Sequence, residues 1–156
     1  KEYPEIPIEL HIGGKGAYEK EYKELAKELQ IDDITIWLGF ISQEEVAKAW
    51  ANMDLAIIYS TLLSESFGVS AVEAQASGCA TIISDIPGLM EATEPEKTSY
   101  VVSKKNEQAL ANAIIELYQN QPKREKLEKN GRIFVEKNYE LNNCFRKIEN
   151  LFKCRI

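Results

Sequence analysis

Short apolar segments alternate with helical patterns along most of the chain, and this alternation restricts the fold more than any other feature. The strand candidates are residues 6–12, 34–38, 55–59, 80–84 and 100–102. Between them, apolar residues recur at the three- and four-residue spacing of a helix face. Parallel strands need long crossover connections, which are usually helices. The sequence therefore predicts an α/β fold, a Rossmann-like parallel sheet with helices on both faces.

Local signals predict where several helices begin and end. Ser42, followed three residues later by Glu45, is typical of a capping box. Residues 68–77 form a helical pattern that ends at Gly78, a residue suited to the left-handed position after a helix. From Asn106, a predicted helix cap, onward the whole pattern is helical.

Composition and charge indicate a soluble, cytoplasmic domain. The 156 residues suffice for one domain, and 44% hydrophobic and 28% charged residues are ordinary globular values. A net charge of −6 argues against non-specific nucleic-acid binding, which requires a basic surface. No apolar run approaches the roughly 20 residues of a membrane span. The three cysteines, Cys79, Cys144 and Cys154, are widely spaced, and we expect free thiols in a reducing compartment.

Two glutamates eight residues apart, Glu65 and Glu73, bracket a Phe-Gly step in the segment E-S-F-G-V-S-A-V-E. Gly68 allows a loop to turn into a helix at this point. The N-terminus of such a helix presents free N–H groups and a positive dipole end to an anion, ideally a diphosphate. Glu73 is then placed to accept hydrogen bonds from a ribose diol, and Glu65 from sugar hydroxyls. This segment is suited to binding a sugar nucleotide.

The two acids also have simpler explanations. Glu65 can be a solvated loop acid, and Glu73 can belong to an internal cap or salt bridge. An unpaired carboxylate between Val72 and Ala74 is costly to bury, so we favour a ribose diol as the partner of Glu73.

The segment resembles the Glu-x₇-Glu signature of family 4 retaining, nucleotide-sugar-dependent glycosyltransferases, which have the GT-B fold. The flanking sequence is also similar to that family, in the segments L-H-I-G-G-K-G, I-T-I-W-L-G-F, M-D-L-A-I-I-Y-S and S-G-C-A-T-I-I-S-D-I-P-G. The resemblance runs from about residue 6 to the C-terminal helices and covers one half of a GT-B enzyme. It implies that residues 1–156 are a single nucleotide-sugar-binding domain of a longer two-domain enzyme.

The resemblance assigns roles to residues of the motif and of two earlier loops. Glu65 is the catalytic candidate, in contact with the transferred sugar. The donor-binding candidates are Ser66, Phe67, Gly68, Val69, Ser70 and Glu73 in the motif, and Gly14, Lys15, Gly39 and Phe40 in the loops.

Within the motif, Phe67, Gly68 and Val69 are expected to act mainly through backbone N–H groups. Ser66 stands where many relatives have glycine, which changes the backbone freedom of the loop. The hydroxyl of Ser70 either contacts a phosphate oxygen or caps its own helix.

The earlier loops have alternatives too. The segment G-G-K-G lacks the spacing of a Walker loop, and Gly14 is expected to let the backbone pass close to the nucleotide. Lys15 is either a phosphate ligand or, as we favour, a solvated loop lysine. Gly39 and Phe40 lie where relatives bind the nucleobase through main-chain groups, although Phe40 can equally belong to the core.

The family pattern also implies parts that this sequence does not contain. The family's domain begins with a further strand and helix, which carry an Arg and a Lys for the diphosphate, and an acceptor-binding domain precedes it. The first strand of a doubly wound sheet is usually central, so its absence should leave exposed apolar edges. We expect a fragment that is inactive alone.

The resemblance implies a UDP- or GDP-sugar as donor and a hydroxyl of a glycan or glycolipid as acceptor. No cofactor and no metal are expected, and the full enzyme could associate with the inner face of the membrane. His11 is expected to be a packed strand residue, and the adjacent Asp32 and Asp33 surface acids rather than metal ligands. Asp85 is expected to be a turn and cap residue.

Two other classes of protein remain as alternatives. One is a non-catalytic pseudo-glycosyltransferase module that stabilises a partner, against which the intact Glu65 and Glu73 count. The other is an NAD-binding Rossmann domain. The glycine loop lacks the G-x-G-x-x-G form, and no acid ends a following strand about 20 residues on.

Overall fold

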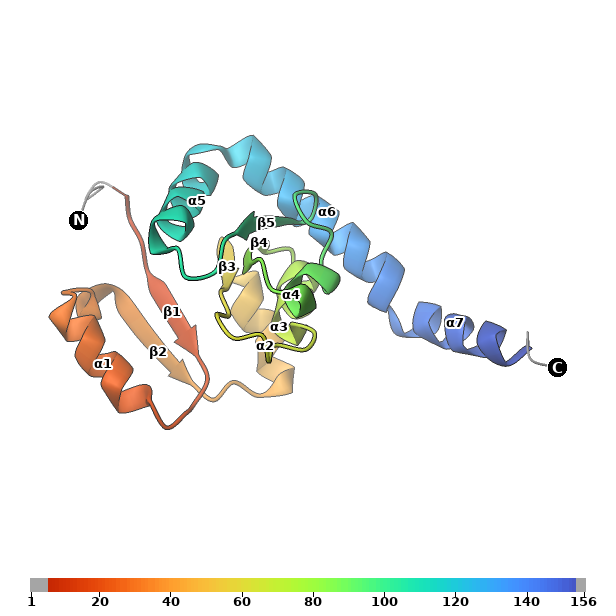
Figure 1. Ribbon diagram of the computed structural model, residues 1–156, viewed down its shortest axis with the longest axis horizontal. Coiled ribbons are helices and arrows are strands. Elements are labelled where there is room, and N and C mark those ends of the chain that lie inside the picture. The colour runs from red at the N-terminus through yellow and green to blue at the C-terminus, as the bar shows by residue number, and fades with distance from the viewer. Residues whose placement is uncertain (1–5, 154–156) are drawn as a thin grey trace. The chain divides into compact units, whose positions relative to one another are not determined.

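The computed structural model describes residues 6–153. The chain forms two compact units, one ending at Glu45 and the other beginning at Val46, each with its own parallel sheet. The first unit contains β1 (Leu10–Gly13), α1 (Glu19–Glu28), the 3₁₀ helix η1 (Asp32–Ile34), β2 (Thr35–Gly39) and the start of α2 (Gln43–Ala51) (Figure 1). The second contains β3 (Leu55–Ile58), α3 (Val69–Ala76), β4 (Ala80–Ser84), α4 (Pro87–Glu91), β5 (Ser99–Val102), α5 (Glu107–Gln119), α6 (Gln121–Tyr139) and α7 (Leu141–Lys153).

In the first unit, β1 and β2 pair in parallel. β1 begins at Leu10 rather than at residue 6, as the sequence had suggested. Pro7 has no backbone N–H to donate to a strand ladder, which accounts for the later start. Helix α1 contacts β2 through Lys23, whose ammonium lies 5.5 Å from the ring centre of Trp37.

In the predicted capping box at the start of α2, the interaction made by the side chain of Glu45 is confirmed. Oε2 of Glu45 accepts hydrogen bonds from the N–H of Ser42 at 3.2 Å and from its hydroxyl at 2.6 Å. These bonds favour the carboxylate form and hold the pKa of Glu45 below its usual range. Because the folded-state pKa is lowered, the stabilisation is present at neutral pH and is lost as the pH falls through that value.

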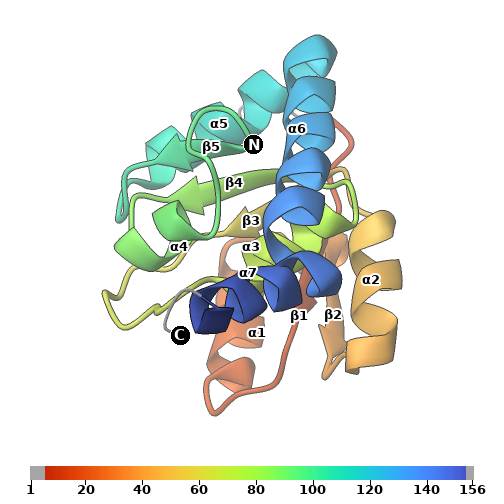
Figure 2. The same cartoon turned by 90° about the vertical axis from the view of Figure 1, so that its right-hand side faces the viewer.

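The second unit is built on a parallel sheet of order β3-β4-β5. All five residues of the central strand β4 are buried, which explains why its sequence shows no polar alternation. Ile82 packs with Leu117 of α5, on the face that α5 and α6 cover. The next residue, Ile83, points to the other face and packs with Ala71 of α3 and Leu89 of α4. The predicted arrangement of helices on both faces is therefore confirmed (Figure 2).

The described strands form two sheets, where the sequence analysis expected one. Within residues 6–153, no strand ladder joins β1 or β2 to β3, β4 or β5. Apolar periodicity identifies strands but does not say which strands pair. Three apolar side chains on the strands are partly exposed, since Ile36, Leu38 and Ile57 have 40%, 39% and 38% of their surface accessible.

The end of α3 has the predicted glycine cap. Gly78 adopts a φ of 80°, in the left-handed region. Its N–H donates to the carbonyl of Gln75 at 3.1 Å, and the N–H of Cys79 donates to the carbonyl of Ala74 at 3.0 Å. This pair of bonds is a Schellman motif, which ends the helix and directs the chain into β4.

Asparagine caps begin the two long helices, α5 and α6. Oδ1 of Asn106 accepts from the N–H of Ala109 at 2.9 Å, and Oδ1 of Asn120 accepts from the N–H of Lys123 at 3.0 Å. Helix α7 follows α6 and contains no buried residue. No helix in the described part of the chain is long and apolar enough to cross a membrane.

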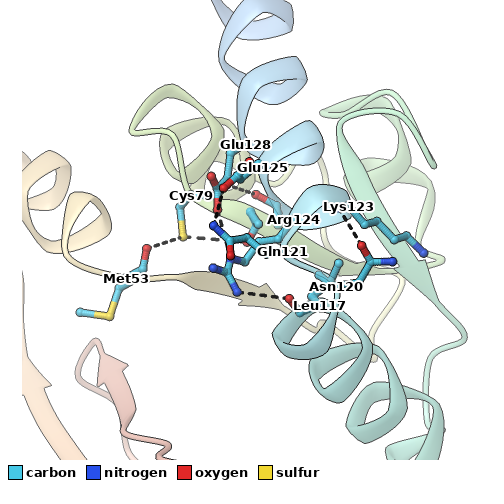
Figure 3. A network of polar contacts seen from close by, with 11 residues as sticks. Met53, Cys79, Leu117, Asn120, Gln121, Lys123, Arg124, Glu125 and Glu128 are labelled. Atoms are coloured by element: carbon cyan, nitrogen blue, oxygen red, sulfur yellow. Dashed lines mark hydrogen bonds and ion pairs between the residues drawn. The ribbon is translucent and has the colours of Figure 1, made fainter.

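The thiol of Cys79 is buried at the start of β4. It donates a hydrogen bond to the carbonyl oxygen of Met53 at 3.3 Å (Figure 3). Glu128, which lies 3.5 Å from the guanidinium of Arg124, is among the charges near the thiol. Burial, with smaller contributions from Glu128 and Asp54, raises the pKa of Cys79 to about 12. The nucleophilic thiolate is therefore scarce at neutral pH.

We expect Cys79 to resist alkylation by iodoacetamide in the folded protein, because the thiolate is the reacting form. Cys144 is less buried and is the internal control, expected to react first. Timed labelling near neutral pH, followed by peptide mass mapping, measures each site separately. Equal labelling rates for Cys79 and Cys144 in the folded protein would contradict the buried position.

Candidate functional site

Helix α3 begins directly after Gly68, which adopts a φ of 71°. Val69 and Ser70 are its first two residues, and N–H groups at these positions have no acceptor within the helix. Glu73 falls in the second turn, and Glu65 lies on the loop before the helix. The structure confirms the predicted change from loop to helix between the two acids.

The carboxylate of Glu65 folds back onto the motif. Its Oε1 accepts a hydrogen bond from the N–H of Gly68 at 3.1 Å. This N–H was predicted to bind a ligand, but in this structure it is occupied by Glu65. The first N–H groups that remain for an anion are those of Val69 and Ser70.

Gly68 is required at its position for two reasons. A φ of 71° is strained for any residue with a Cβ. An added Cβ would also lie 2.4 Å from Cδ2 of Leu89, which is fully buried in α4. The helix start is therefore packed directly against α4.

A second glycine, Gly88 in α4, lies directly against the backbone of the same loop. A Cβ at this position would lie 2.4 Å from the carbonyl oxygen of Glu65, 2.7 Å from the carbonyl carbon of Ser66 and 2.9 Å from the N of Phe67. The backbone of the motif thus lies on the Cα of Gly88. Sequence analysis did not identify this contact, although Gly88 closes the S-D-I-P-G segment.

The partly buried ring of Phe67 packs against the end of α6. It meets the ring of Tyr139 edge-on, with centroids 5.7 Å apart and an interplanar angle of 84°. Tyr139, the last residue of α6, also contacts Phe134 at 5.8 Å. The side chain of Phe67 thus anchors the loop to the end of α6.

The remaining motif residues are placed as follows. Ser66, Val69 and Ser70 are exposed, and Val69 has 60% of its surface accessible. The cap position of α3 is Gly68 and carries no side-chain hydrogen bond, so Ser70 does not cap its own helix. Glu73 is half-buried and already has an interaction partner in this structure. The position of Glu73 in the second turn of α3, and not an unsatisfied carboxylate, therefore makes it a candidate ligand for the donor.

Hydrogen bonds join the carboxyl ends of the strands around the motif. The hydroxyl of Ser84, at the end of β4, donates to the carbonyl of Ser60 after β3 at 2.6 Å. The hydroxyl of Tyr59 donates to the carbonyl of Ser103 at 2.8 Å and accepts from the N–H of Asn106 at 2.7 Å. These bonds fix the loops at the sheet edge where ligands of open α/β folds bind.

In the first unit, the predicted loop residues come together. The N–H of Gly14 donates to the carbonyl of Gly39 at 2.7 Å. Cε of Lys15 is 3.5 Å from where a Cβ of Gly39 would lie. Phe40 is 73% exposed, so the alternative that placed it in the core is wrong. Both glycines have positive φ values, 122° for Gly14 and 67° for Gly39, which residues with a side chain rarely adopt.

Residues set aside in the sequence analysis have structural roles. Nε2 of His11 lies 3.1 Å from Oε2 of Glu9. Asp32 and Asp33 are exposed, as expected. Asp85 does not cap a helix; its Oδ1 accepts from the N–H of Lys104 at 2.8 Å, because the end of β4 lies beside the end of β5.

A cavity of about 460 Å³ lies on another part of the second unit, between the β4–β5 connection and α6. Its walls include Lys97, Asn130, Phe134 and Lys137. None of the predicted site residues lines it, so this cavity is separate from the predicted donor site.

Residues 2–134 match the family model for glycosyl transferases group 1. An uncharacterized glycosyltransferase of Methanocaldococcus jannaschii is 27% identical over 144 residues, which are 92% of this chain and 36% of that protein. The chain thus spans about a third of the length of this curated relative.

Solved structures share the fold. Anabaena HepE in complex with UDP and glucose superimposes with a TM-score of 0.86 at 21% identity, over 96% of this chain and 41% of that one. The C-terminal domain of a group 1 glycosyl transferase from Francisella tularensis superimposes with a TM-score of 0.72 at 22% identity, over 90% of this chain and 91% of that one. This chain therefore belongs to the glycosyl transferases group 1 family and has the fold of a C-terminal GT-B domain.

Proposed function

We propose that this chain is the donor-binding part of a retaining glycosyltransferase, and that it binds a nucleoside-diphosphate sugar. The observation that carries the proposal is the start of α3. Free helix N–H groups, Glu65 and Glu73 gather there, at the carboxyl end of a parallel sheet. The related fold of HepE, solved with UDP and glucose, supports this class of ligand.

Each group at the start of α3 suits one part of such a donor. The N–H groups of Val69 and Ser70, with the positive end of the helix dipole, suit the diphosphate. The carboxylate of Glu73 suits the ribose diol. Glu65 uses one oxygen for the N–H of Gly68, which orients its other oxygen for a hydroxyl of the transferred sugar.

The loops of the first unit, taken by themselves, suit a nucleobase and a phosphate. The hydrogen bond between the backbones of Gly14 and Gly39 leaves main chain without side chains at the carboxyl ends of β1 and β2. We assign the main chain of Gly39 and Phe40 to the nucleobase. Lys15 is exposed, and its Cε lies 3.5 Å from where a Cβ of Gly39 would be, so its ammonium is available to a phosphate.

In the proposed reaction, the bond between the anomeric carbon and the diphosphate breaks, the acceptor oxygen forms the new bond on the same face, and the proton of the acceptor hydroxyl passes to the leaving diphosphate. The chain stabilises the negative charge that develops on the leaving diphosphate through the helix N–H groups. Its two glutamates position the donor and do not neutralise that charge. We assign no metal and no cofactor to this step, and we place the reaction in the cytoplasm, with a glycan or glycolipid as acceptor.

The proposal is tested by calorimetric titration of the protein with UDP-glucose, GDP-mannose and NADH. Saturable binding of one nucleotide sugar, without binding of NADH, is the expected result. Binding of NADH alone would support the dinucleotide-binding alternative and overturn the proposal. We further expect no sugar transfer by the 156-residue chain alone, because closure of a second domain is needed to orient the acceptor and exclude water.

A further inference from the structure

Two residues far from the motif in sequence hold the loop that carries Glu65. Gly88 lies under the backbone of residues 65–67, and Tyr139 lies against the ring of Phe67. We infer that Gly88 and Tyr139 are positioning residues. They hold the loop so that Glu65 is placed to bind the transferred sugar. This inference rests on the proposed function.

The support from Gly88 is rigid because its helix is fixed in the core. Ile86 and Leu89, on either side of it, are fully buried in the cluster that includes Ile83 of β4. The atoms that would meet a Cβ at Gly88 are backbone atoms of Glu65, Ser66 and Phe67, and these cannot rotate away as a side chain can. A single added methyl group must therefore displace the loop.

The support from Tyr139 is an aromatic contact at the end of α6. Edge-to-face pairs of this kind stabilise a contact beyond the area that they bury. The hydroxyl of Tyr139 also lies 3.4 Å from the carbonyl oxygen of Glu91, the last residue of α4. Tyr139 thus links the motif loop to the helix that contains Gly88.

The two supports act on Glu65 and much less on the start of α3. Gly88 touches residues 65–67, whereas Val69, Ser70 and Glu73 lie on the helix that follows. In the proposed site, the helix binds the nucleotide and Glu65 binds the sugar. Displacing the loop should therefore weaken binding of a nucleotide sugar while leaving binding of the bare nucleotide nearly intact.

The test compares UDP-glucose with UDP in the full-length protein that contains this chain, using the Gly88→Ala, Tyr139→Leu and Tyr139→Phe variants. We expect Gly88→Ala and Tyr139→Leu to lower the affinity for UDP-glucose about tenfold and that for UDP less than about threefold, since a hydrogen bond to a charged group is affected. Tyr139→Phe keeps the ring and is expected to bind both ligands as the wild type does. Where the base is guanine, GDP-mannose and GDP replace this pair.

Two matched controls report general loss of stability. Gly131→Ala adds a methyl group to a buried helical glycine, where it meets the side chain of Gln75 at 3.0 Å rather than backbone. Tyr118→Leu removes a ring that is 46% exposed on α5. Both controls should leave the ratio of the two affinities unchanged. Equal losses for UDP and UDP-glucose in Tyr139→Leu would overturn the inference.

A second measurement does not depend on any ligand. The N–H of Gly68 is bonded to Glu65, so its hydrogen exchange reports the position of the loop. Tyr139→Leu should speed this exchange about tenfold relative to amides in β4, whereas Tyr139→Phe should not. Unchanged exchange in Tyr139→Leu would overturn the inference even if the proposed function holds. If the wild type binds no nucleotide sugar, the proposed function fails and the exchange result still decides the role of Tyr139.

Discussion

Replacing Glu73 with alanine is expected to weaken binding of the nucleotide sugar about 10–150-fold in the full-length protein, measured by calorimetry. The helix places this carboxylate in its second turn, one turn beyond the N–H groups that suit the diphosphate. Loss of hydrogen bonds from a charged acceptor to a ribose diol costs about 1.5–3 kcal/mol, which gives this range of affinity. UDP and UDP-glucose should lose affinity equally, because both carry the ribose.

An equal loss of affinity for UDP and UDP-glucose distinguishes the role of Glu73 from that of Glu65. Changes around Glu65 are expected to weaken binding of UDP-glucose only, because only that ligand carries the sugar. Glu107→Ala is the matched control, because Glu107 is an exposed glutamate in the first turn of α5. It should leave both affinities unchanged. Unaltered binding by Glu73→Ala, in a protein whose circular dichroism matches the wild type, would remove Glu73 from the site.

Replacing Ile82 with alanine is expected to lower the free energy of unfolding by about 2–5 kcal/mol. Ile82 is fully buried at the centre of β4, in the cluster that joins the sheet to α5 and α6. A truncated side chain there leaves a cavity that the flanking strands cannot close. Urea denaturation followed by circular dichroism measures the change.

The control for this prediction is Ile133→Ala. Ile133 lies on α6 and is 52% exposed, so the same truncation should change stability by about 0.5 kcal/mol or less. Similar losses for the two variants would show that Ile82 does not lie in the core as described.

Local signals in the sequence predicted those features of the fold that depend on neighbouring residues. The bond between Ser42 and Glu45, the glycine cap at Gly78 and the asparagine cap at Asn106 all form as expected. Each involves residues within five positions of one another, so the pattern contains the whole interaction. Strand β4 was also predicted with the bounds that the structure has, Ala80–Ser84.

The candidate site was only partly predictable, because some of its contacts join residues that are distant in the sequence. The spacing of Glu65, Gly68 and Glu73 predicts a loop that turns into a helix, and the structure contains this loop and helix. It could not reveal that Glu65 would occupy the N–H of Gly68, which depends on the path of the loop over Gly88. The exposure of Phe40 was equally undecided, because an aromatic residue after a strand suits both a core and a surface.

By itself, the sequence determined the α/β class, the order of the helices and strands, and the motif with its two carboxylates, because periodicity and short spacings encode these directly. The division of the strands between two sheets was decided only by the tertiary structure. So was the support of the motif by Gly88 and Tyr139, which lie 20 or more positions beyond Gly68 in the chain. Contacts between distant residues depend on how whole helices and strands pack, and no local pattern in one sequence carries that information.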